Sequence, residues 1–362
     1  MDTLSLAAST PSPNAMFGSP ETLRRLEDVS ADRGDLDLGR RVAELRAWLE
    51  DDLADVERDL ASLDRAPTPM HASARHLLSL GGKRLRPLCV ALAARAGAGF
   101  NSAARDLAVA AELVHSATLL HDDVVDVGDL RRGAPASRVV YGNAASIFAG
   151  DWLLVEAIAR IRASRFEDLL DRALGVLRAM LNAEALQLAA RGTFAPDVSA
   201  YFRVVEGKTA SLFEWAMYAG ARAGGLAPAQ CDALEAYGKN LGVAFQVMDD
   251  VLDVAGDAAV VGKSMFSDLR EGKLTYPLIL AVERDRAFGD ALRAQCAGDA
   301  PVDAELARRA GEALRATGAL EDSAALARKL SNESIRQLSA LPPSRARESL
   351  ESVALATLHR KK

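Results

Sequence analysis

Cysteine and aromatic residues are scarce in this chain of 362 residues. The three cysteines, Cys89, Cys231 and Cys296, are widely spaced and form no CxxC pair. An odd number of cysteines in this pattern argues against a disulfide scaffold and against a zinc site. Aromatic residues make up only 5% of the chain while alanine and leucine abound, a composition that favours helices over sheets.

Long hydrophobic runs and a basic leader are also missing from the sequence. No uninterrupted stretch approaches the roughly 18 apolar residues of a membrane span. The first 20 residues contain no lysine or arginine, so they do not resemble a secretory signal. The net charge of −6 gives no support for a nucleic-acid-binding surface. We therefore expect a cytoplasmic protein that binds no nucleic acid, although an apolar substrate could bring it to a membrane surface.

The chain divides into a short N-terminal extension and one large helical domain. Residues 1–38 are rich in Ser, Pro, Ala and Asp, a composition typical of a disordered segment. Beyond them, apolar positions recur at helical spacing, and we predict a single all-α domain over 39–362. Its long helices are expected at 102–127, 144–161, 166–190, 198–223 and 228–254. Asn101 or Ser102 can cap the first of these, and Gly128 can end it.

Two of these helices end in a cluster of three aspartates of the form Asp-Asp-x-x-Asp. The members are Asp122, Asp123 and Asp126 in the first cluster, and Asp249, Asp250 and Asp253 in the second. Spacings of three and four residues put three carboxylates on one helix face, where like charges repel. Both clusters are predicted at the C-terminal end of a helix, which the helix dipole makes an unfavourable place for anions, so a cation is needed there. Mg²⁺ takes oxygen ligands and keeps positions for water and phosphate, so we predict that both clusters hold Mg²⁺.

Basic residues accompany both clusters along the chain. A turn flanked by glycine, Gly81-Gly82-Lys83-Arg84-Leu85-Arg86-Pro87, offers three cations suited to the oxygens of a diphosphate. The candidate ligands of a phosphorylated substrate are Lys83, Arg86, Arg131, Arg132, Lys208, Lys263 and Lys273. For any single one of them a solvated surface charge is the simpler interpretation, and only their joint occurrence beside the acids favours a diphosphate site.

Three further side chains lie near the clusters, and two of them allow two interpretations. His115 lies two helical turns before Asp122 and could donate a hydrogen bond to a phosphate, but a structural histidine is an equally good interpretation. Gln246 lies one turn before Asp250, on or near the acidic face. Phe245 could pack on a substrate chain, although an aromatic residue is more often part of the core.

Several common catalytic motifs do not occur in the sequence. It contains no Ser-His-Asp order, no glycine-rich nucleotide loop and no HExxH motif, so hydrolase, kinase and metalloprotease activities have no support. The remaining chemistry is the metal-assisted departure of a diphosphate. In that chemistry Mg²⁺ polarises the leaving oxygen and basic residues hold the charge that develops.

Taken in order, these motifs resemble those of the trans-isoprenyl diphosphate synthases, also called polyprenyl synthetases. The similarity covers 71–277 and is weaker beyond. It rests on GGKRLRP, HSATLLHDDVVD, RRG, YGNAASIFAGDWLL, EALQL, KTASLF, AFQVMDDVLD and EGKLTYP. The resemblance, strongest to long-chain octaprenyl-type synthases, implies an isoprenoid-synthase helical bundle around a deep central cavity. It also implies a homodimer and a peripheral contact with a membrane when the product is released.

The resemblance further implies the sequential condensation of isopentenyl diphosphate onto an allylic diphosphate. The six aspartates would hold three Mg²⁺ ions per active site, bound to the allylic diphosphate. Isopentenyl diphosphate would be held by Lys83, Arg86, His115 and Arg132. The allylic diphosphate would be held by Arg131, Lys208, Lys263 and Lys273. The catalytic residues near the reacting carbons would be Lys208, Thr209 and Gln246.

The resemblance also implies how product length is set. Residues on the helix that leads into the first cluster limit how deep the growing chain can reach, and we call them the depth gauge. The gauge positions are Thr118 and Ala117, where short-chain enzymes carry an aromatic floor, and then Val114 one turn deeper. Each added isoprene unit reaches one turn further, ~5.4 Å. All three residues are small here, so we expect a long product of about octaprenyl length. A bulky residue of another helix, such as Phe148 or Trp152, could instead close the tunnel at geranylgeranyl or farnesyl length.

Two readings of another class compete with the synthase. A type I terpene cyclase would share the fold and the first acidic motif, but it should lack GGKRLRP and carry an Asn/Ser/Glu-type second motif. A non-catalytic subunit of a two-component synthase would be expected to lose one aspartate cluster or the basic turn. The chain keeps all of these motifs, so an active synthase is the preferred interpretation.

Overall fold

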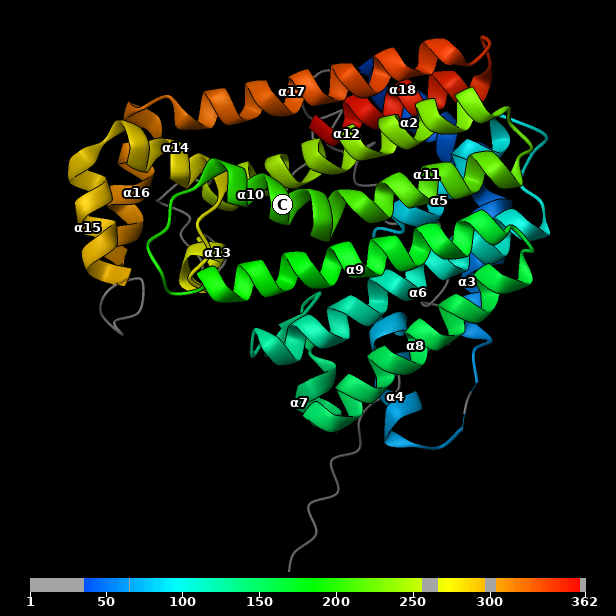
Figure 1. Cartoon of the computed structure of the whole chain (residues 1–362), viewed down its shortest axis with the longest axis horizontal. Helices are drawn as coiled ribbons and strands as arrows, with labels where there is room; N and C mark the ends of the chain where they lie inside the picture. Colours follow the sequence, from blue (N-terminus) through cyan, green and yellow to red (C-terminus); the bar gives the residue numbers. More distant parts are fainter. Residues whose placement is uncertain (1–35, 65, 256–265, 297–303, 359–362) are drawn as a thin grey trace, which may run out of the picture.

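The structure is a computed structural model that describes residues 36–64, 66–255, 266–296 and 304–358. Within these ranges the chain is helical almost throughout, as Figure 1 shows. The first described helix begins at Leu36, three residues before the predicted start of the domain. The predicted extension lies almost entirely outside the described residues, so its boundary at residue 38 stays a prediction.

The helices follow the predicted boundaries closely. In chain order they are α2 (Leu36–Trp48), α3 (Glu50–Ala61), α4 (Pro69–Ser79), α5 (Leu85–Arg95), α6 (Ser102–Val125), α7 (Ser137–Tyr141), α8 (Asn143–Ala163), α9 (Glu167–Ala190), α10 (Val198–Val205), α11 (Ser211–Ala223), α12 (Pro228–Val254), α13 (Ser267–Arg270), α14 (Tyr276–Arg284), α15 (Arg286–Cys296), α16 (Ala304–Ala316), α17 (Ala319–Gln337) and α18 (Arg345–Leu358). Of the two candidate caps of α6, Asn101 is the one used, because its side chain accepts a 2.9 Å hydrogen bond from the N–H of Ala104.

The helix predicted over 198–223 is interrupted in the middle. Between α10 and α11 the backbone forms a π-helical turn, η2 (Glu206–Ala210). Such turns are rare and occur frequently at functional sites. Lys208 and Thr209, two residues that the sequence assigns to catalysis, both lie in this turn.

Close packing holds the π turn between two neighbouring helices. A Cβ on Gly207 would lie 2.8 Å from the carbonyl oxygen of Ala179 in α9. A Cβ on Gly242 of α12 would lie 2.6 Å from the Cα of Ala210. Since side chains at these two glycines would collide with backbone atoms, the approach of both helices to η2 requires glycine at both positions.

Helix α6 is the centre of the main core. It packs against α5, α8 and α11, and its apolar residues are buried almost all round, as expected for an interior helix. Figure 1 shows the long helices α12, α11, α9, α6 and α8 stacked one after another across the molecule. A smaller apolar cluster of α13, α14, α15 and α16 packs at the end of α12 that carries the second aspartate cluster.

The only strands in the described part of the chain form one very short hairpin. They are β1 (Leu130–Arg131) and β2 (Ala134–Pro135), which pair antiparallel. The turn between them needs positive φ at Arg132 (55°) and at Gly133 (80°). This hairpin follows α6 directly, so it brings two arginines next to the first aspartate cluster. Among the described helices, none has the length and apolar character needed to cross a membrane.

Candidate active site

A cavity of about 860 Å³ lies among α5, α6, α8, α9, the π turn and α12. Each aspartate cluster contributes one member to its wall, Asp122 from α6 and Asp249 from α12. Its basic lining includes Lys83, Arg86, Arg131, Arg132 and Lys208. Its apolar lining includes Leu119, Leu154, Leu177, Met180, Leu181 and Phe245. Acidic, basic and apolar surfaces therefore meet in one space, which is in the size range of a ligand site.

The three carboxylates of the first cluster all pair with basic side chains. Asp122 lies 3.3 Å from the Nζ of Lys208. Asp123 is almost fully buried and accepts a 2.9 Å hydrogen bond from the Nε of Arg131. Asp126 is the C-cap of α6 and pairs with two cations, the Nζ of Lys273 at 3.1 Å and the guanidinium of Arg191. The mutual repulsion predicted from the sequence is thus relieved by one nearby arginine and by three cations from distant parts of the chain.

The second cluster is held mostly by neutral donors. Asp250 accepts a 2.5 Å hydrogen bond from the hydroxyl of Tyr201 and a 2.9 Å hydrogen bond from the side-chain amide of Gln246. Asp253 accepts a 2.6 Å hydrogen bond from the hydroxyl of Ser267 and a 3.3 Å hydrogen bond from its backbone N–H. Of the three aspartates only Asp249 lines the large cavity, since the other two are turned towards α10 and the start of α13.

The surroundings of the first cluster change the acidity of its carboxyl groups. Burial raises the pKa of Asp122, although the ammonium of Lys208 opposes the shift. Burial also disfavours ionisation of Asp126, but its ion pairs with Lys273 and Arg191 outweigh this and hold its pKa below the usual value. Asp126 is therefore firmly ionised, whereas Asp122 gains from any added cation.

Asp250 differs because no cation of the described chain pairs with it. Burial, with added repulsion from Asp268 and Asp249, raises the pKa of Asp250 to about 8. The O–H of Tyr201 and the N–H of Gln246 favour the ionised form and oppose that rise.

The basic turn before α5 is fixed by a buried arginine. Arg84 has a left-handed backbone (φ 44°) and is only 4% exposed. Its guanidinium donates to Glu57 at 2.6 Å and to Glu112 at 2.5 Å. This anchor directs the two flanking cations, Lys83 and Arg86, to the wall of the cavity. All three cations of the turn belong to the cavity lining, but the guanidinium of Arg84 is paired with two glutamates, so Lys83 and Arg86 are the better candidates for a substrate.

The hairpin arginines lie beside the same turn. A Cβ on Gly82 would lie 2.6 Å from the guanidinium of Arg132, so this glycine leaves room for the arginine. Two basic motifs that are about 50 residues apart in the sequence are thereby in contact. His115 lines the same region of the cavity. Its burial, together with the nearby Arg86, Arg132 and other arginines, holds its pKa well below the usual value, so the ring is neutral.

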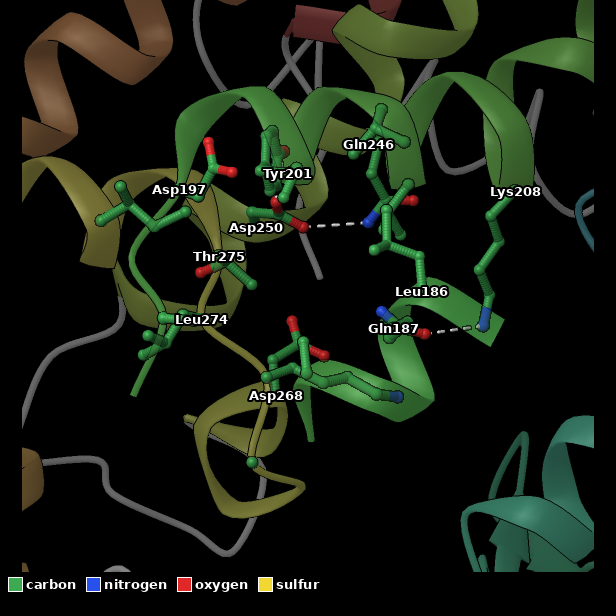
Figure 2. A pocket seen from close by; sticks show the side chains of 18 of the residues that line it. Leu186, Gln187, Asp197, Tyr201, Lys208, Gln246, Asp250, Asp268, Leu274 and Thr275 are labelled. Carbon is green, nitrogen blue, oxygen red and sulfur yellow. Dashed lines mark hydrogen bonds between the residues drawn. The ribbon is translucent and has the colours of Figure 1, made fainter. Parts of the chain in front are cut away.

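A smaller cavity of about 200 Å³ lies behind the catalytic candidates (Figure 2). Lys208, Thr209 and Gln246 line both cavities and separate them. The hydroxyl of Thr209 donates a 2.9 Å hydrogen bond to the amide oxygen of Gln246, and Lys208 donates to the side chain of Gln187 at 3.3 Å. Thus the three predicted catalytic side chains, which come from the π turn and from α12, are neighbours in space.

The predicted depth gauge is only partly at the cavity wall. Thr118 lines the cavity, and so does its neighbour Leu119. Ala117 and Val114 are buried in the core of α6, and neither belongs to the described cavity lining, so their role in chain length stays a prediction.

The two bulky side chains that could have closed the tunnel lie elsewhere. Phe148 is 60% exposed on α8, and the ring of Trp152 packs on His71 with 4.7 Å between centroids. Neither side chain is part of the described lining of the large cavity.

Sequence reasoning missed five polar residues around the site. They are Glu184 and Gln187 of α9, Arg191 at the C-cap of α9, Tyr201 of α10, and Asp268. The first three are three and four residues apart on one face of α9, and that spacing was a usable signal. Tyr201 and Asp268 reach the site only through tertiary packing. Lys263, a predicted ligand of the allylic diphosphate, lies outside the described residues.

The carboxylates of the two clusters are arranged to suit a metal ion that keeps some of its water ligands. Among the described residues, no group of three or more His, Cys, Asp or Glu side chains converges on a single point. Mg²⁺ does not need such a cage, because it commonly uses one or two carboxylates together with phosphate oxygens and water. Carboxylates on two walls of one cavity, with basic side chains beside them, fit this mode of binding.

Comparison with known proteins assigns the family. A model of the Polyprenyl synthetase family matches residues 67–312 of the chain. The chain belongs to the polyprenyl synthetase family. The Octaprenyl diphosphate synthase of Escherichia coli (strain K12) is 35% identical to it over 287 residues, which cover 79% of this chain and 88% of that protein.

Further relatives of this polyprenyl synthetase differ in the products for which they are named. The Short chain isoprenyl diphosphate synthase of Methanothermobacter thermautotrophicus is 33% identical over 301 residues, covering 82% of this chain and 92% of that protein. The crystal structure of a decaprenyl diphosphate synthase from Rhodobacter capsulatus has a TM-score of 0.81 at 33% identity and covers 87% of this chain and 98% of that chain.

Family membership confirms the predicted all-α isoprenoid-synthase fold and the predicted class of enzyme. This polyprenyl synthetase is a prenyltransferase, and its family uses isopentenyl diphosphate with an allylic diphosphate and depends on Mg²⁺. Its relatives are named for short, octaprenyl and decaprenyl products, so the family does not determine product length.

Proposed function

We propose that this polyprenyl synthetase condenses isopentenyl diphosphate with an allylic diphosphate to give a trans-polyprenyl diphosphate of about octaprenyl length. The observation that supports this most directly is a single cavity whose wall includes Asp122, Asp249, Lys83, Arg86 and Arg132. Carboxylates for a metal and cations for a diphosphate then lie on either side of an apolar space in which a hydrocarbon chain can grow.

The acids that fit direct Mg²⁺ binding best are Asp122, Asp126 and Asp249. Asp122 and Asp249 line the large cavity, and the two cations paired with Asp126 are partly exposed, so a metal ion can reach this carboxylate. The other three aspartates, Asp123, Asp250 and Asp253, each accept a hydrogen bond from a side chain inside the protein and would support these ligands. When bound, Mg²⁺ would neutralise the allylic diphosphate and polarise its leaving oxygen. The number of three ions per site remains a prediction from the family resemblance.

The protein's own side chains would hold and orient both substrates. Lys208 and Lys273 would hold the negative charge that develops on the departing allylic diphosphate. The basic turn, Arg132 and the neutral His115 would hold the diphosphate of isopentenyl diphosphate. The C–C bond then forms when the double bond of isopentenyl diphosphate attacks the allylic carbon, and the proton lost in that step passes to the released diphosphate.

The lining of the large cavity supports a long product. Within the described lining, Phe245 is the single phenylalanine, tyrosine or tryptophan, and the remaining apolar positions are mostly leucines of α6, α8 and α9. Apolar side chains along the path of the growing chain would also protect an allylic cation from capture by water. A shorter product, of geranylgeranyl or farnesyl length, is the alternative.

One incubation tests both the proposed reaction and the proposed product length. Purified protein is mixed with Mg²⁺, isopentenyl diphosphate and farnesyl diphosphate, and the dephosphorylated products are sized by chromatography. We expect a ladder that ends near octaprenyl length. Absence of any elongation would refute the synthase activity, whereas a ladder that ends at geranylgeranyl length would refute the long product and leave the reaction intact.

The alternatives of another class have weaker support. A terpene cyclase has no use for the second set of cations at Lys83, Arg86 and Arg132, which line the cavity here. A non-catalytic subunit would not need both aspartate clusters beside those cations. The same incubation separates them, because a cyclase would release a hydrocarbon and a non-catalytic subunit would release nothing.

We also propose that the protein forms a homodimer. Exposed apolar side chains form stripes on two adjacent helices, with Phe148 and Val155 on α8 and Leu174, Leu181 and Leu188 on α9. Each stripe repeats every seven residues, as expected of helices that pack against another helix. Light scattering would report the mass, and Leu174→Glu should shift a dimer towards monomer. A cytoplasmic location and a peripheral membrane contact during product release remain predictions.

A further inference from the structure

A chain of three hydrogen bonds runs from α10 to the centre of the site. The hydroxyl of Tyr201 donates to the Oδ2 of Asp250 at 2.5 Å. The Oδ1 of Asp250 accepts from the Nε2 of Gln246 at 2.9 Å, and the Oε1 of Gln246 accepts from the hydroxyl of Thr209 at 2.9 Å. Figure 2 shows Tyr201, Asp250 and Gln246 side by side at the wall of the smaller cavity.

The order of donors and acceptors fixes which way the amide of Gln246 points. The amide nitrogen of Gln246 is the atom that faces Oδ1 of Asp250, and the amide oxygen is the atom that faces the hydroxyl of Thr209. The NH₂ group of Gln246 is therefore held at Asp250, and its oxygen is turned away towards Thr209. Gln246 and Thr209 both line the large cavity.

The orientation of this amide matters for the chemistry proposed above. Positive charge develops on the allylic carbon as the diphosphate leaves. An amide oxygen directed at that carbon stabilises the charge, whereas the N–H groups of a reversed amide would repel it. A side-chain amide can reverse by a simple rotation, so something must hold it in place.

We propose that Tyr201 is a positioning residue for prenyl transfer, because through Asp250 it holds the amide oxygen of Gln246 towards the reacting carbons. The inference rests on the proposed function for its chemistry. It assigns Asp250 a role as the link between the tyrosine and the amide, in place of direct metal binding.

The surroundings of Tyr201 make its hydroxyl a rigid donor. The side chain is 9% exposed, and its ring stacks on Tyr276 with 5.6 Å between centroids. The ring of Phe202 packs edge-on at 5.1 Å. Because these contacts involve only the ring, Tyr201→Phe removes the hydroxyl and keeps the packing. Tyr276→Phe is the matched control, since it removes a hydroxyl from the same aromatic group without changing the three hydrogen bonds.

Steady-state kinetics measure the effect on the reaction. In Tyr201→Phe we expect kcat to fall roughly 10- to 100-fold, with the KM of each diphosphate changed by less than about twofold, because the lost bond acts on the transition state. Tyr276→Phe should stay near the wild-type values. A double-mutant cycle with Gln246→Met tests whether the effect of Tyr201 passes through Gln246. In the Gln246→Met protein, Tyr201→Phe should lower kcat only slightly, since the amide that the tyrosine positions is gone.

A second measurement follows the amide without any substrate. The chain has five glutamines, so the side-chain amides of protein labelled with ¹⁵N-glutamine give few NMR signals, and the Gln246→Met spectrum identifies the one of interest. The Gln246 N–H signals should shift and exchange faster with water in Tyr201→Phe, and remain unchanged in Tyr276→Phe.

The two measurements separate the possible failures. A wild-type protein that elongates nothing would overturn the proposed function, while the NMR experiment would still decide on the hydrogen-bonded link. An unchanged kcat in Tyr201→Phe, equal losses in both tyrosine variants, additive losses in the cycle, or an unchanged Gln246 signal would each overturn the positioning role.

Discussion

The two aspartate clusters share one spacing, yet the protein surrounds them differently. Every carboxylate of the first cluster pairs with a lysine or an arginine side chain. In the second cluster, Asp250 and Asp253 accept hydrogen bonds from the hydroxyls of Tyr201 and Ser267 and from the amide of Gln246. The ion pairs of Asp122 and Asp126 are partly exposed, so a metal ion can replace the paired cation there. Asp250 and Asp253 are buried and accept hydrogen bonds from neutral donors, which fixes their geometry, while Asp249 of the same cluster lines the cavity. One motif can therefore supply both a metal ligand and a scaffold.

The largest effect should come from the acids that line the large cavity. Asp122→Asn and Asp249→Asn each remove a negative charge there, and kcat should fall roughly 10²- to 10³-fold, as when one group that stabilises transition-state charge is lost. Asp253→Asn is the control, because its amide oxygen can still accept from Ser267; its kcat should fall by less than about tenfold. Initial rates with farnesyl and isopentenyl diphosphate measure all three, and equal losses would contradict the division.

The clusters should also differ in how pH affects the stability of the metal-free protein. The pKa of Asp250 is about 8 in the folded protein and about 3.9 when unfolded, so between these values only the native state keeps its proton. Stability should therefore fall as pH rises through this window, by at most about 1.4 kcal/mol per pH unit. Asp126 affects stability in the opposite direction. Its pKa is lower in the folded protein than in the unfolded chain, so the stability it contributes is lost only as the pH falls below the ordinary pKa of an aspartate.

Urea unfolding of the metal-free protein between roughly pH 5 and pH 8 measures this dependence. In Asp250→Asn the group no longer titrates, so the unfolding free energy should vary less with pH than in the wild type. The slope is the informative quantity, since the substitution also changes the stability at every pH. The same slope in both proteins would show that Asp250 stays ionised in the fold.

A smaller effect should follow from removing one cation of the first cluster. Arg191 competes with a metal for Asp126, so Arg191→Gln should lower the Mg²⁺ concentration for half-maximal rate by roughly two- to fivefold, the effect of losing one partly exposed ion pair. Arg172→Gln is the matched control, because Arg172 lies on α9, the helix that Arg191 caps, and pairs with Glu235 instead of with an aspartate of either cluster. A Mg²⁺ titration distinguishes them, and a higher requirement in Arg191→Gln would mean that this arginine binds substrate instead.

The least effect on rate is expected in the helix before the first cluster. Thr118 lines the cavity, so Thr118→Phe should shorten the longest product by several isoprene units, while the rate of the first addition changes by less than about threefold. Thr118→Val, which keeps the size of the side chain, should leave the products unchanged. Chromatographic sizing compares the three proteins, and an unaltered ladder in Thr118→Phe would exclude this face of α6 as the gauge.

Local signals in the sequence were sufficient for the helices and for the acids. Helical spacing, the cap at Asn101 and the glycine after the first cluster predict α6 to within two residues at each end. Both clusters are found where they were predicted, and Lys83 and Arg86 line the cavity. These features depend on neighbours within a few positions along the chain, which a single sequence displays directly.

The partners of the acids could not be read in the same way. Arg84 resembles its neighbours in the turn, and only the tertiary fold sets it between Glu57 and Glu112. Tyr201 is 49 residues from Asp250 in sequence, and nothing local marks it as a donor. Ala117 and Thr118 are adjacent small residues, and which of them faces the cavity depends on how α6 is rotated in the bundle.

The π turn between α10 and α11 limits how this enzyme can change. Consecutive residues of an α-helix are rotated by about 100° around its axis, and a π turn accommodates one extra residue without disturbing the helix on either side. Deleting a single residue from Glu206–Ala210 would keep the helix continuous but rotate Lys208 and Thr209 away from α12, or else turn all of α10, including Tyr201. No substitution elsewhere restores a lost residue. The number of residues in this turn is therefore as important for the active site as the identity of any side chain.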